Sequence, residues 1–239
     1  MSDTPDAATI VVTGAGSGVG RATAVKFAQA GWRVALVGRG EEKLGETARL
    51  AGGDCAVFAC DVGNETAVQT MAAAVIERFG TVTALVQSAA TNTAPRDWAQ
   101  VSSEAYHAVM AANLHGPFYV VRALLPTLRE TRGTIVHINS EAGLAASEKA
   151  GVPYVASKFG LAGLTQSINA EERRNGVRAV SIFPGDINTP LLDKRPVPPP
   201  MDARAQMLQP EDLADSVWYA VNLPNRALAE EIVIRPTQN

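Results

Sequence analysis

The strongest constraint on the fold of this 239-residue chain is an alternation of two apolar patterns. Short, almost continuous apolar runs rich in β-branched residues indicate strands buried on both faces. They occur at 9–12, 33–37, 56–59, 82–87, 134–138, 177–183 and 231–234. Between them lie longer segments with helical 3.6-residue periodicity, most clearly at 21–30, 66–79 and 154–174. The order predicts parallel strands joined by helical crossovers.

This pattern is typical of an α/β fold of the Rossmann type, a doubly wound parallel sheet of about seven strands with helices on both faces. No internal repeat or long linker interrupts it, so we expect one domain over residues 1–239. Ligands of such sheets bind beyond the carboxyl ends of the strands. The residues that follow each expected strand are therefore the first candidates for a functional site.

One compositional break follows the sixth expected strand, in the proline-rich segment 190–210. Proline prevents regular helix at its start, and loops at this edge of a sheet often carry function. We expect a flap over the site. A surface connection without a role and a polyproline peptide ligand are the alternatives.

Composition excludes several classes of protein. A net charge of −3 argues against a nucleic-acid binder, which needs a basic surface. Two cysteines, Cys55 and Cys60, exclude a disulfide scaffold and a multi-cysteine zinc site. The three histidines (His107, His115, His137) lack metal-ligand spacing, so no metal is expected. The start of the chain has no signal-peptide pattern, and no stretch is apolar enough to span a membrane. We expect a cytoplasmic protein with neither nucleic-acid nor membrane partners.

The first expected strand leads into the glycine-rich sequence T-G-A-G-S-G-V-G at 13–20. Glycines allow backbone N–H groups to approach a pyrophosphate, which then lies at the N-terminus of the following helix. The glycines Gly14, Gly18 and Gly20 follow the spacing T-G-x-x-x-G-x-G rather than G-x-G-x-x-G. We interpret this as a dinucleotide site. The alternative is a tight turn without a ligand.

The end of the second expected strand indicates which dinucleotide binds. An acidic residue usually accepts the ribose 2′-hydroxyl of NAD, but here Arg39 stands in that region. Its guanidinium suits a 2′-phosphate and favours NADP(H). The alternative is a solvated arginine beside Glu41 and Glu42. After the third strand, Asp61 and Val62 are candidates to flank the adenine.

Tyr154 and Lys158 are spaced to share one helix face. A cation about 4 Å from a phenol, at an effective dielectric constant of about 20, contributes roughly 4 kcal/mol. That would lower the tyrosine pKa from about 10 by up to about three units, into the range of a general acid/base. A Y-x-x-x-K pattern alone occurs by chance. Here, however, Ser140 ends the fifth strand and Thr189, a candidate to bind a carboxamide, follows the sixth.

Taken together, these segments resemble the short-chain dehydrogenase/reductase family, in its compact single-domain branch. The resemblance covers nearly the whole chain. It rests on T-G-A-G-S-G-V-G (13–20), D-V (61–62), A-N-L-H-G (112–116), I-V-H-I-N-S-E-A-G (135–143), Y-V-A-S-K (154–158) and P-G-D-I-N-T-P (184–190). It implies a catalytic and dinucleotide-binding domain whose cofactor is preferably NADP(H), with NAD(H) possible.

The resemblance also implies a catalytic tetrad of Asn113, Ser140, Tyr154 and Lys158. Tyr154 would exchange a proton with the substrate oxygen, and Ser140 would hold that oxygen. Lys158 would lower the tyrosine pKa and bind the nicotinamide ribose. Asn113 would hold a water in a proton relay to Lys158. The expected cofactor-binding residues are Gly14, Ser17, Gly18, Val19, Arg39, Asp61, Val62, Ala89, Tyr154, Lys158, Pro184, Gly185, Ile187 and Thr189.

The chain departs from the family pattern at several positions. The usual N-N-A-G after the fourth strand reads Q-S-A-A, so Ala90 replaces a glycine near the cofactor. Asn139 replaces the commoner serine before Ser140. Glu141 follows Ser140 and either reaches the substrate pocket or faces solvent.

We therefore predict an NADP(H)-dependent oxidoreductase that interconverts a carbonyl and a secondary alcohol by hydride transfer. The resemblance implies a small-molecule substrate and a homotetramer or homodimer. One alternative is a non-catalytic, dinucleotide-sensing regulator of the same fold, although such proteins often lose the tyrosine or lysine. Another is an epimerase or dehydratase of related fold, although these usually have an added substrate domain.

Overall fold

The computed structural model describes residues 8–237. Its core is a seven-stranded parallel sheet in the order β3-β2-β1-β4-β5-β6-β7. The strands are β1 (Thr9–Thr13), β2 (Arg33–Gly38), β3 (Cys55–Ala59), β4 (Ala84–Gln87), β5 (Thr134–Ile138), β6 (Arg178–Pro184) and β7 (Glu231–Ile234). The chain proceeds outward from β1 in one direction, then returns and proceeds from β4 in the other. This reversal between β1 and β4 is the place where such sheets bind ligands.

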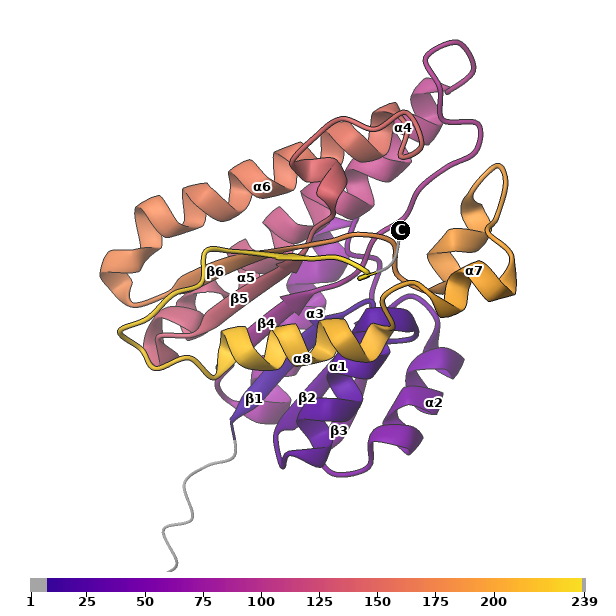
Figure 1. The fold of residues 1–239 in the computed structure, drawn as a ribbon. Helices are drawn as coiled ribbons and strands as arrows, with labels where there is room; N and C mark the ends of the chain where they lie inside the picture. Colours follow the sequence, from indigo (N-terminus) through magenta and orange to yellow (C-terminus); the bar gives the residue numbers. More distant parts are fainter. Residues whose placement is uncertain (1–7, 238–239) are drawn as a thin grey trace, which may run out of the picture.

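Helices cover both faces of the sheet (Figure 1). They are α1 (Gly18–Gln29), α2 (Glu41–Ala51), α3 (Glu65–Phe79), α4 (Ser103–Met110), α5 (Gly116–Thr131), α6 (Val152–Glu172), α7 (Met201–Ala205) and α8 (Pro210–Val221). A π-helical turn at Ala111–His115 joins α4 to α5, and short 3₁₀ turns lie at Glu141–Gly143, Arg173–Asn175 and Pro190–Lys194. Within residues 8–237, none of the helices has the length and low polarity needed to cross a bilayer.

Two hydrophobic cores lie on opposite faces of the sheet. Strand β1 contributes to both, because Ile10 and Val12 enter one core and Val11 enters the other. The first core includes residues of α1 and α8, which pack closely against each other, and the second includes residues of α3 and α5. The apolar runs of β1, β2, β4, β5 and β6 are thus strands buried on both faces, as predicted, whereas the edge strands β3 and β7 are only partly buried.

The structure shifts some of the expected element boundaries. Strand β4 begins at Ala84 rather than 82, because the Val82 N–H donates to the Thr127 hydroxyl at 2.9 Å instead of pairing with a strand. Helix α1 begins at Gly18, three residues early, because the last glycines of the turn form its first turn. Helix α6 begins at Val152 with Pro153 in its first turn, where proline is well tolerated.

All seven strands run in one direction, so the segments that follow them meet at the same edge of the sheet. The turn after β1 contacts the turn after β4, where the Ala89 N–H donates to the Thr13 hydroxyl at 3.2 Å. The base of the segment after β6 is held closed, because Asn188 and Leu208 are joined by a backbone hydrogen bond of 2.8 Å. This edge therefore brings together the sequence segments that the motifs singled out.

Candidate active site

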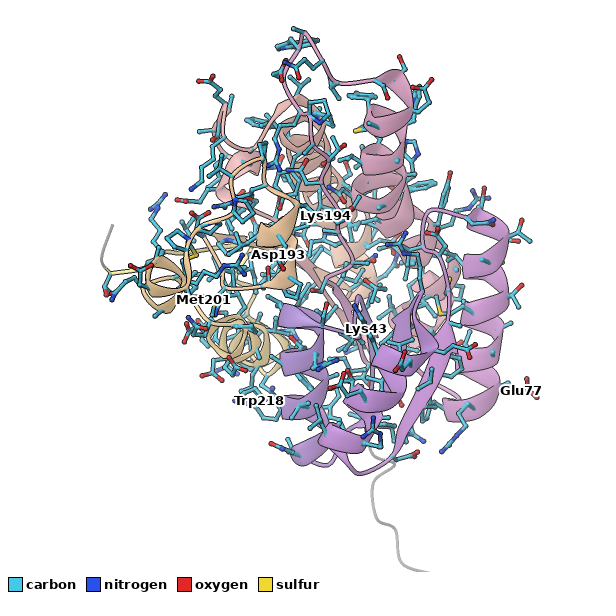
Figure 2. All side chains as sticks on the ribbon, turned by 90° about the vertical axis from the view of Figure 1, so that its right-hand side faces the viewer. Lys43, Glu77, Asp193, Lys194, Met201 and Trp218 are labelled. Carbon is cyan, nitrogen blue, oxygen red and sulfur yellow. The ribbon has the colours of Figure 1, made fainter. Side chains whose placement is uncertain are left out.

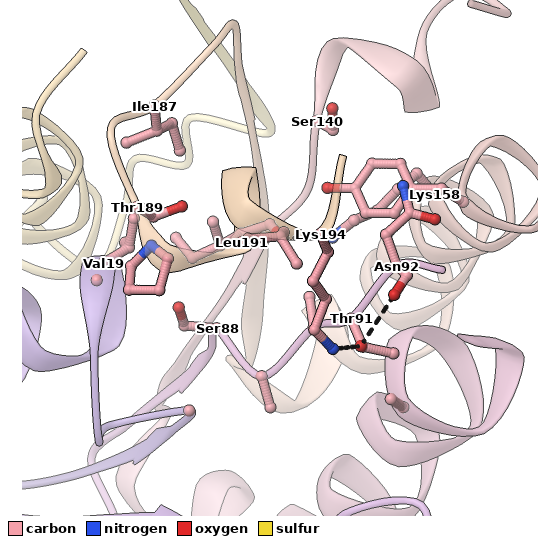
Figure 3. Close-up of a pocket in the computed structure, with 18 of the residues that line it drawn as sticks. Val19, Ser88, Thr91, Asn92, Ser140, Lys158, Ile187, Thr189, Leu191 and Lys194 are labelled. Atoms are coloured by element: carbon pink, nitrogen blue, oxygen red, sulfur yellow. Dashed lines mark hydrogen bonds between the residues drawn. The ribbon is translucent and has the colours of Figure 1, made fainter. Parts of the chain in front are cut away.

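A cleft of about 1280 Å³ lies at the carboxyl edge of the sheet. Residues from the turns after β1, β2, β3, β4, β5 and β6 and from α6 line it, and Figure 3 shows part of this lining. Every cofactor-binding residue predicted from the sequence lines the cleft, as do Ser140, Tyr154 and Lys158. Asn113, the remaining predicted tetrad residue, lies outside the lining. One continuous site therefore unites residues more than 200 positions apart, from Gly14 to Pro236.

The glycine-rich turn has the geometry of an anion cradle. Gly14 and Gly18 adopt φ of 69° and 51°, a region that side chains disfavour. A Cβ at Gly20 would lie 2.3 Å from the Gly14 carbonyl oxygen. In the described structure, the first turn of α1 has no acidic residue, and the Ser17 side chain does not cap it. The helix N–H groups therefore remain available to a diphosphate, so this turn fits the expected dinucleotide.

The end of the cleft lined by the residues that follow β2 is cationic. Arg39 is exposed there and, within the described part of the chain, forms no ion pair with Glu41 or Glu42. Lys43 in the first turn of α2 lines the same end and packs beside Gly16 (Figure 2). The sequence analysis missed Lys43, although its position four residues after Arg39 was a usable signal. The two cations suit a phosphate group.

Asp61 and Val62 lie at the end of β3, where the adenine was expected. The Asp61 carboxylate accepts the N–H of Gly63 at 3.0 Å, which holds the turn in place. Val62 is buried and packs against Gly116, where any Cβ would lie within 2.8 Å of its side chain. Both residues line the cleft, and Val62 offers it an apolar wall.

Tyr154 and Lys158 face each other across one turn of α6. The Lys158 ammonium lies 5.5 Å from the centre of the Tyr154 ring and donates a 2.8 Å hydrogen bond to the Ile138 carbonyl. Lys158 is only 2% exposed, and this burial lowers its pKa to about 7. A lysine with this pKa can gain or release a proton near neutral pH.

The pKa of Tyr154 differs from the expectation. Burial raises it above the usual tyrosine value, and this effect outweighs a hydrogen bond with Ser140 and the nearby charges of Arg195 and Arg96, which lower it. Lys158 is not among the groups that lower it. The prediction that Lys158 draws this pKa toward neutrality is therefore wrong for this structure, because burial of the phenol outweighs the groups that lower its pKa. Tyr154 is a protonated phenol at neutral pH.

Asn113 lies in the π-helical turn and is 1% exposed. Its carboxamide makes three hydrogen bonds. It accepts the Thr91 N–H at 2.8 Å and donates to the Thr91 carbonyl at 2.9 Å and to the Ser157 hydroxyl at 3.1 Å. The side chain therefore fixes the loop after β4 and has no direct hydrogen bond with Lys158. A π-turn leaves main-chain groups without their usual helical partners, so any water bound here would bind to the main chain.

Ser140 and its two neighbours, Asn139 and Glu141, differ in their hydrogen bonding. The Ser140 hydroxyl accepts the Ala142 N–H at 3.2 Å and starts the 3₁₀ turn. Glu141 lines the cleft, but its carboxylate accepts a hydrogen bond from Arg235 in the segment after β7. Asn139 is 3% exposed, and its carboxamide has no hydrogen-bond partner among the described residues. The sequence analysis did not place Asn139 in the site.

The departure at Ala90 introduces no backbone strain. Arg132 is the non-glycine residue with positive φ in the described chain, so Ala90 keeps an ordinary backbone conformation. Nearby, the Gln87 carboxamide donates to the Pro117 carbonyl at 2.9 Å and anchors the end of β4 to α5. This loop therefore forms normally without the family's usual glycine.

The segment 190–210 covers the cleft with its first part. Pro190, Leu191, Leu192, Lys194 and Arg195 line the cleft, whereas residues 196–205 lie outside the lining. The Lys194 ammonium reaches across to the Thr91 hydroxyl at 2.6 Å (Figure 3). The lining also includes charged residues that the sequence analysis missed on loops without periodicity, namely Arg96, Lys149, Lys194 and Arg195.

Potential metal ligands do not cluster within residues 8–237. No group of three or more histidine, cysteine or acidic side chains is close enough there to hold a metal ion. Cys55 and Cys60 are free thiols, and Cys60 is buried.

Comparisons with known proteins agree with this geometry. The family model described as short chain dehydrogenase matches residues 8–197. An uncharacterized oxidoreductase of Staphylococcus epidermidis is 32% identical over 227 residues, which cover 95% of this chain and 96% of the relative.

Solved structures give the same result. A metagenomic short-chain oxidoreductase in complex with NADP is 30% identical, with a TM-score of 0.83, and the match covers 96% of this chain and 97% of that one. An actinorhodin polyketide ketoreductase with NADPH is 29% identical, with a TM-score of 0.87 and 98% of both chains covered. Both of those structures contain a nicotinamide dinucleotide, NADP in the first and NADPH in the second.

Proposed function

The chain belongs to the short-chain dehydrogenase family, oxidoreductases that act on CH–OH and C=O groups with NAD(P), and within it we propose an NADP(H)-dependent enzyme with Tyr154 as general acid/base. Its substrates would be a small-molecule carbonyl and the corresponding secondary alcohol. The observation that carries the proposal is the shared cleft. It joins the phosphate cradle at Gly14 to a tyrosine, a serine and a buried lysine.

Residues of the chain itself would carry out the proton transfer. When a nicotinamide dinucleotide is bound, it supplies or accepts the hydride at the substrate carbon. In the reducing direction, the Tyr154 O–H bond breaks and its proton goes to the substrate oxygen, while Ser140 holds that oxygen by a hydrogen bond. The alcohol-oxidising direction reverses both transfers. The raised pKa of Tyr154 keeps the phenol protonated at neutral pH, so a proton is present for transfer to a carbonyl substrate.

Lys158 is suited to replace the proton that Tyr154 gives up. Its pKa of about 7 lets it release a proton near neutral pH, and it lies beside the phenol. Its ammonium would also bind the nicotinamide ribose. Asn113 would contribute by positioning the Thr91 loop and through a water on the main chain of its π-turn.

The preference for NADP(H) rests on the cationic end of the cleft. Arg39 and Lys43 line this end, and neither has an ion pair with an acidic residue in the described part of the chain. A 2′-phosphate would supply the missing negative charge. The position directly after β2 holds Arg39 rather than an acidic residue that accepts a ribose 2′-hydroxyl, which disfavours NAD(H).

The non-catalytic regulator is the weaker alternative, because Ser140, Tyr154 and Lys158 all reach one cleft and Asn113 is buried beside it. We also propose a single-domain enzyme in which residues 190–195 are the part of the 190–210 flap that borders the substrate. A homodimer or homotetramer in the cytoplasm stays part of the proposal.

Substituting the general acid tests this function. A panel of ketones and secondary alcohols is screened by nicotinamide absorbance, and Tyr154→Phe is compared with the wild type on each substrate found. We expect a loss of turnover of roughly 100-fold or more, because proton transfer contributes that much. Dinucleotide affinity should be nearly unchanged. Tyr219→Phe, at an exposed tyrosine of α8, is the matched control. Retained activity in Tyr154→Phe would exclude the proposed role.

A further inference from the structure

The substrate end of the cleft carries more positive than negative charge. Arg96, Lys149, Lys194 and Arg195 line it, and the nearest carboxylate that pairs with any of them is Asp186. The only other acid on this side, among the lining residues, is Glu141, which is neutralised by Arg235 outside this group. The protein as a whole has a net charge of −3, so this local excess opposes the general charge.

Arg96 is the most buried of the four cations. It is 7% exposed and donates to two uncharged acceptors, the Lys194 carbonyl at 2.7 Å and the Lys149 carbonyl at 3.3 Å. Its Nε has no partner in the described structure. A buried guanidinium without a carboxylate is unfavourable unless a ligand supplies the negative charge.

The other three cations are only partly neutralised. The Lys194 ammonium is bound to the Thr91 hydroxyl, which carries no charge. Lys149 and Arg195 share the single carboxylate of Asp186, each in an ion pair. Four cations thus face one carboxylate, and two of them share it.

The protein backbone is shaped to keep Arg96 in place. Gly151 has φ of 80°, and a Cβ there would lie 2.5 Å from the Arg96 side chain. The Val152 N–H, at the start of α6, donates to the Arg96 carbonyl at 3.1 Å. Arg96 therefore contacts the helix that carries Tyr154, the loop at Lys149 and the flap at Lys194. The surrounding backbone therefore holds Arg96 in a fixed position, unlike an exposed surface arginine.

The excess charge lies at the reacting end of the cleft. Arg96 and Arg195 are close enough to Tyr154 to act on its phenol electrostatically, whereas the glycine-rich turn and Arg39 line a different part. The cofactor's phosphates would therefore bind at the glycine-rich turn and Arg39, away from these four cations. We propose that the substrate carries an oxyanion, a carboxylate or a phosphate group, which pairs with Lys194 and the Arg96–Arg195 cations beside the carbon that reacts. This rests on the proposed function and narrows its substrate class.

Binding of small anions tests the proposal directly. The protein is saturated with whichever of NADP⁺ and NAD⁺ binds more tightly, so that the phosphate cradle is filled. Malonate, inorganic phosphate and neutral malonamide are then titrated by calorimetry at low and high salt. We expect malonate or phosphate to bind about tenfold more tightly than malonamide, since a charge-assisted hydrogen bond contributes that much. The advantage should shrink as salt screens it. Preference for malonate identifies a carboxylate and preference for phosphate a phosphate ester.

Variants separate a binding role from a structural one. Lys194→Gln should weaken anion binding about tenfold, with no change in thermal stability, because Lys194 makes one hydrogen bond at the cleft surface. Arg226→Gln removes an equal charge from an exposed loop before β7 and should change nothing. Arg96→Lys keeps the charge and should retain part of the affinity that Arg96→Gln loses. Equal binding of malonate, phosphate and malonamide would overturn the proposal, as would Lys194→Gln behaving like Arg226→Gln.

A kinetic comparison distinguishes this proposal from the proposed function. Hydroxy acids and their methyl esters are compared as substrates, and Lys194→Gln should raise KM for the acid more than for the ester. An enzyme that oxidises neutral esters as well as acids and binds no malonate has no anion site, but its proposed function stands. Lys194-dependent malonate binding in a protein that turns over no alcohol or ketone would support the anion site and exclude the proposed function.

Discussion

Burial decides the protonation states of individual side chains in this site. Lys158 is 2% exposed, and the loss of hydration lowers its pKa to about 7, so that it is a proton donor and acceptor as well as a cation. The same desolvation raises the pKa of Tyr154. In water at neutral pH this pair would be an ammonium beside a neutral phenol, whereas in this cleft Lys158 can lose its proton near neutral pH and Tyr154 keeps its own. Substrate and dinucleotide would bind beside these two side chains.

Arg39 offers a prediction at the same scale. Arg39→Ala should reduce the affinity for NADPH by roughly tenfold, because a charge-assisted hydrogen bond to a phosphate contributes about 1.5–3 kcal/mol. The affinity for NADH, which lacks that phosphate, should barely change. Titrations followed by nicotinamide fluorescence measure both constants. Arg49→Ala, at an exposed arginine near the end of α2, is the control. An unchanged NADPH-to-NADH ratio in Arg39→Ala would refute the assignment.

At the scale of elements, close packing of the β1–α1 turn creates the phosphate cradle. Gly14 approaches the backbone at Ala89, and Gly20 approaches the carbonyl of Gly14. The Thr47 hydroxyl of α2 donates to the Ala15 carbonyl at 2.9 Å and supports the turn from outside. The β1–α1 turn, the loop after β4 and helix α2 therefore together hold the N-terminus of α1 toward the cleft. The position of this helix end, rather than any single side chain, prepares the anion site.

The glycine turn should not tolerate a methyl group at its end. In Gly20→Ala the new Cβ would lie 2.3 Å from the Gly14 carbonyl oxygen, so the backbone of the turn must shift. We expect dinucleotide binding to be lost and the free energy of unfolding to fall by about 1–3 kcal/mol. Gly45→Ala in α2 is the matched control, since its Cβ would meet nothing within 4 Å. It should instead stabilise the protein by about 0.5–1 kcal/mol. Urea unfolding and NADPH titration measure both effects. A Gly20→Ala variant that binds NADPH normally would contradict this account.

At the scale of the whole molecule, an ion pair joins the C-terminal ends of α5 and α6. Arg129 of α5 donates to Glu172 at the end of α6 through two hydrogen bonds, of 2.6 and 2.8 Å. Asn175 donates to the same carboxylate at 2.7 Å. These contacts lower the pKa of Glu172 to about 2. They hold α6, which carries Tyr154 and Lys158, against α5.

This ion pair predicts how stability depends on pH. Because the pKa of Glu172 is lower in the folded than in the unfolded protein, its contribution is full above about pH 4.3 and is lost as pH falls toward 2. Glu172→Gln should reduce the free energy of unfolding at pH 7 by about 1–2 kcal/mol. The difference from the wild type should shrink between pH 4 and pH 2. Urea unfolding at several pH values measures it.

Glu171→Gln, at the exposed neighbouring position, is the control for that measurement. It should differ little from the wild type at any pH. A Glu172→Gln difference that stayed constant down to pH 2 would show that the carboxylate is not stabilised by Arg129.

Local patterns in the chain were sufficient to predict the order of strands and helices, the glycine-rich turn and the Tyr154–Lys158 spacing. Each of these depends on residues within a few positions of one another, where hydrophobic period and steric rules act directly. The family resemblance added Asn113 and the cofactor-binding positions, and all but Asn113 line the cleft. The boundaries that moved, such as the start of β4, depended on a single long-range hydrogen bond from Val82 to Thr127.

Only the tertiary structure revealed the electrostatics of the site. Arg96, Lys149 and Lys194 lie on separate loops, and Arg96 bonds to partners 53 and 98 residues away. No periodicity marks such loops, so their meeting could not be read from the chain. The pKa values of Tyr154 and Lys158 likewise follow from burial, which depends on how every surrounding segment packs. Local sequence determined which helices and strands form, because hydrophobic periodicity and steric rules act between near neighbours. Desolvation and charge clustering depend on residues far apart in the sequence, so only the folded structure decided them.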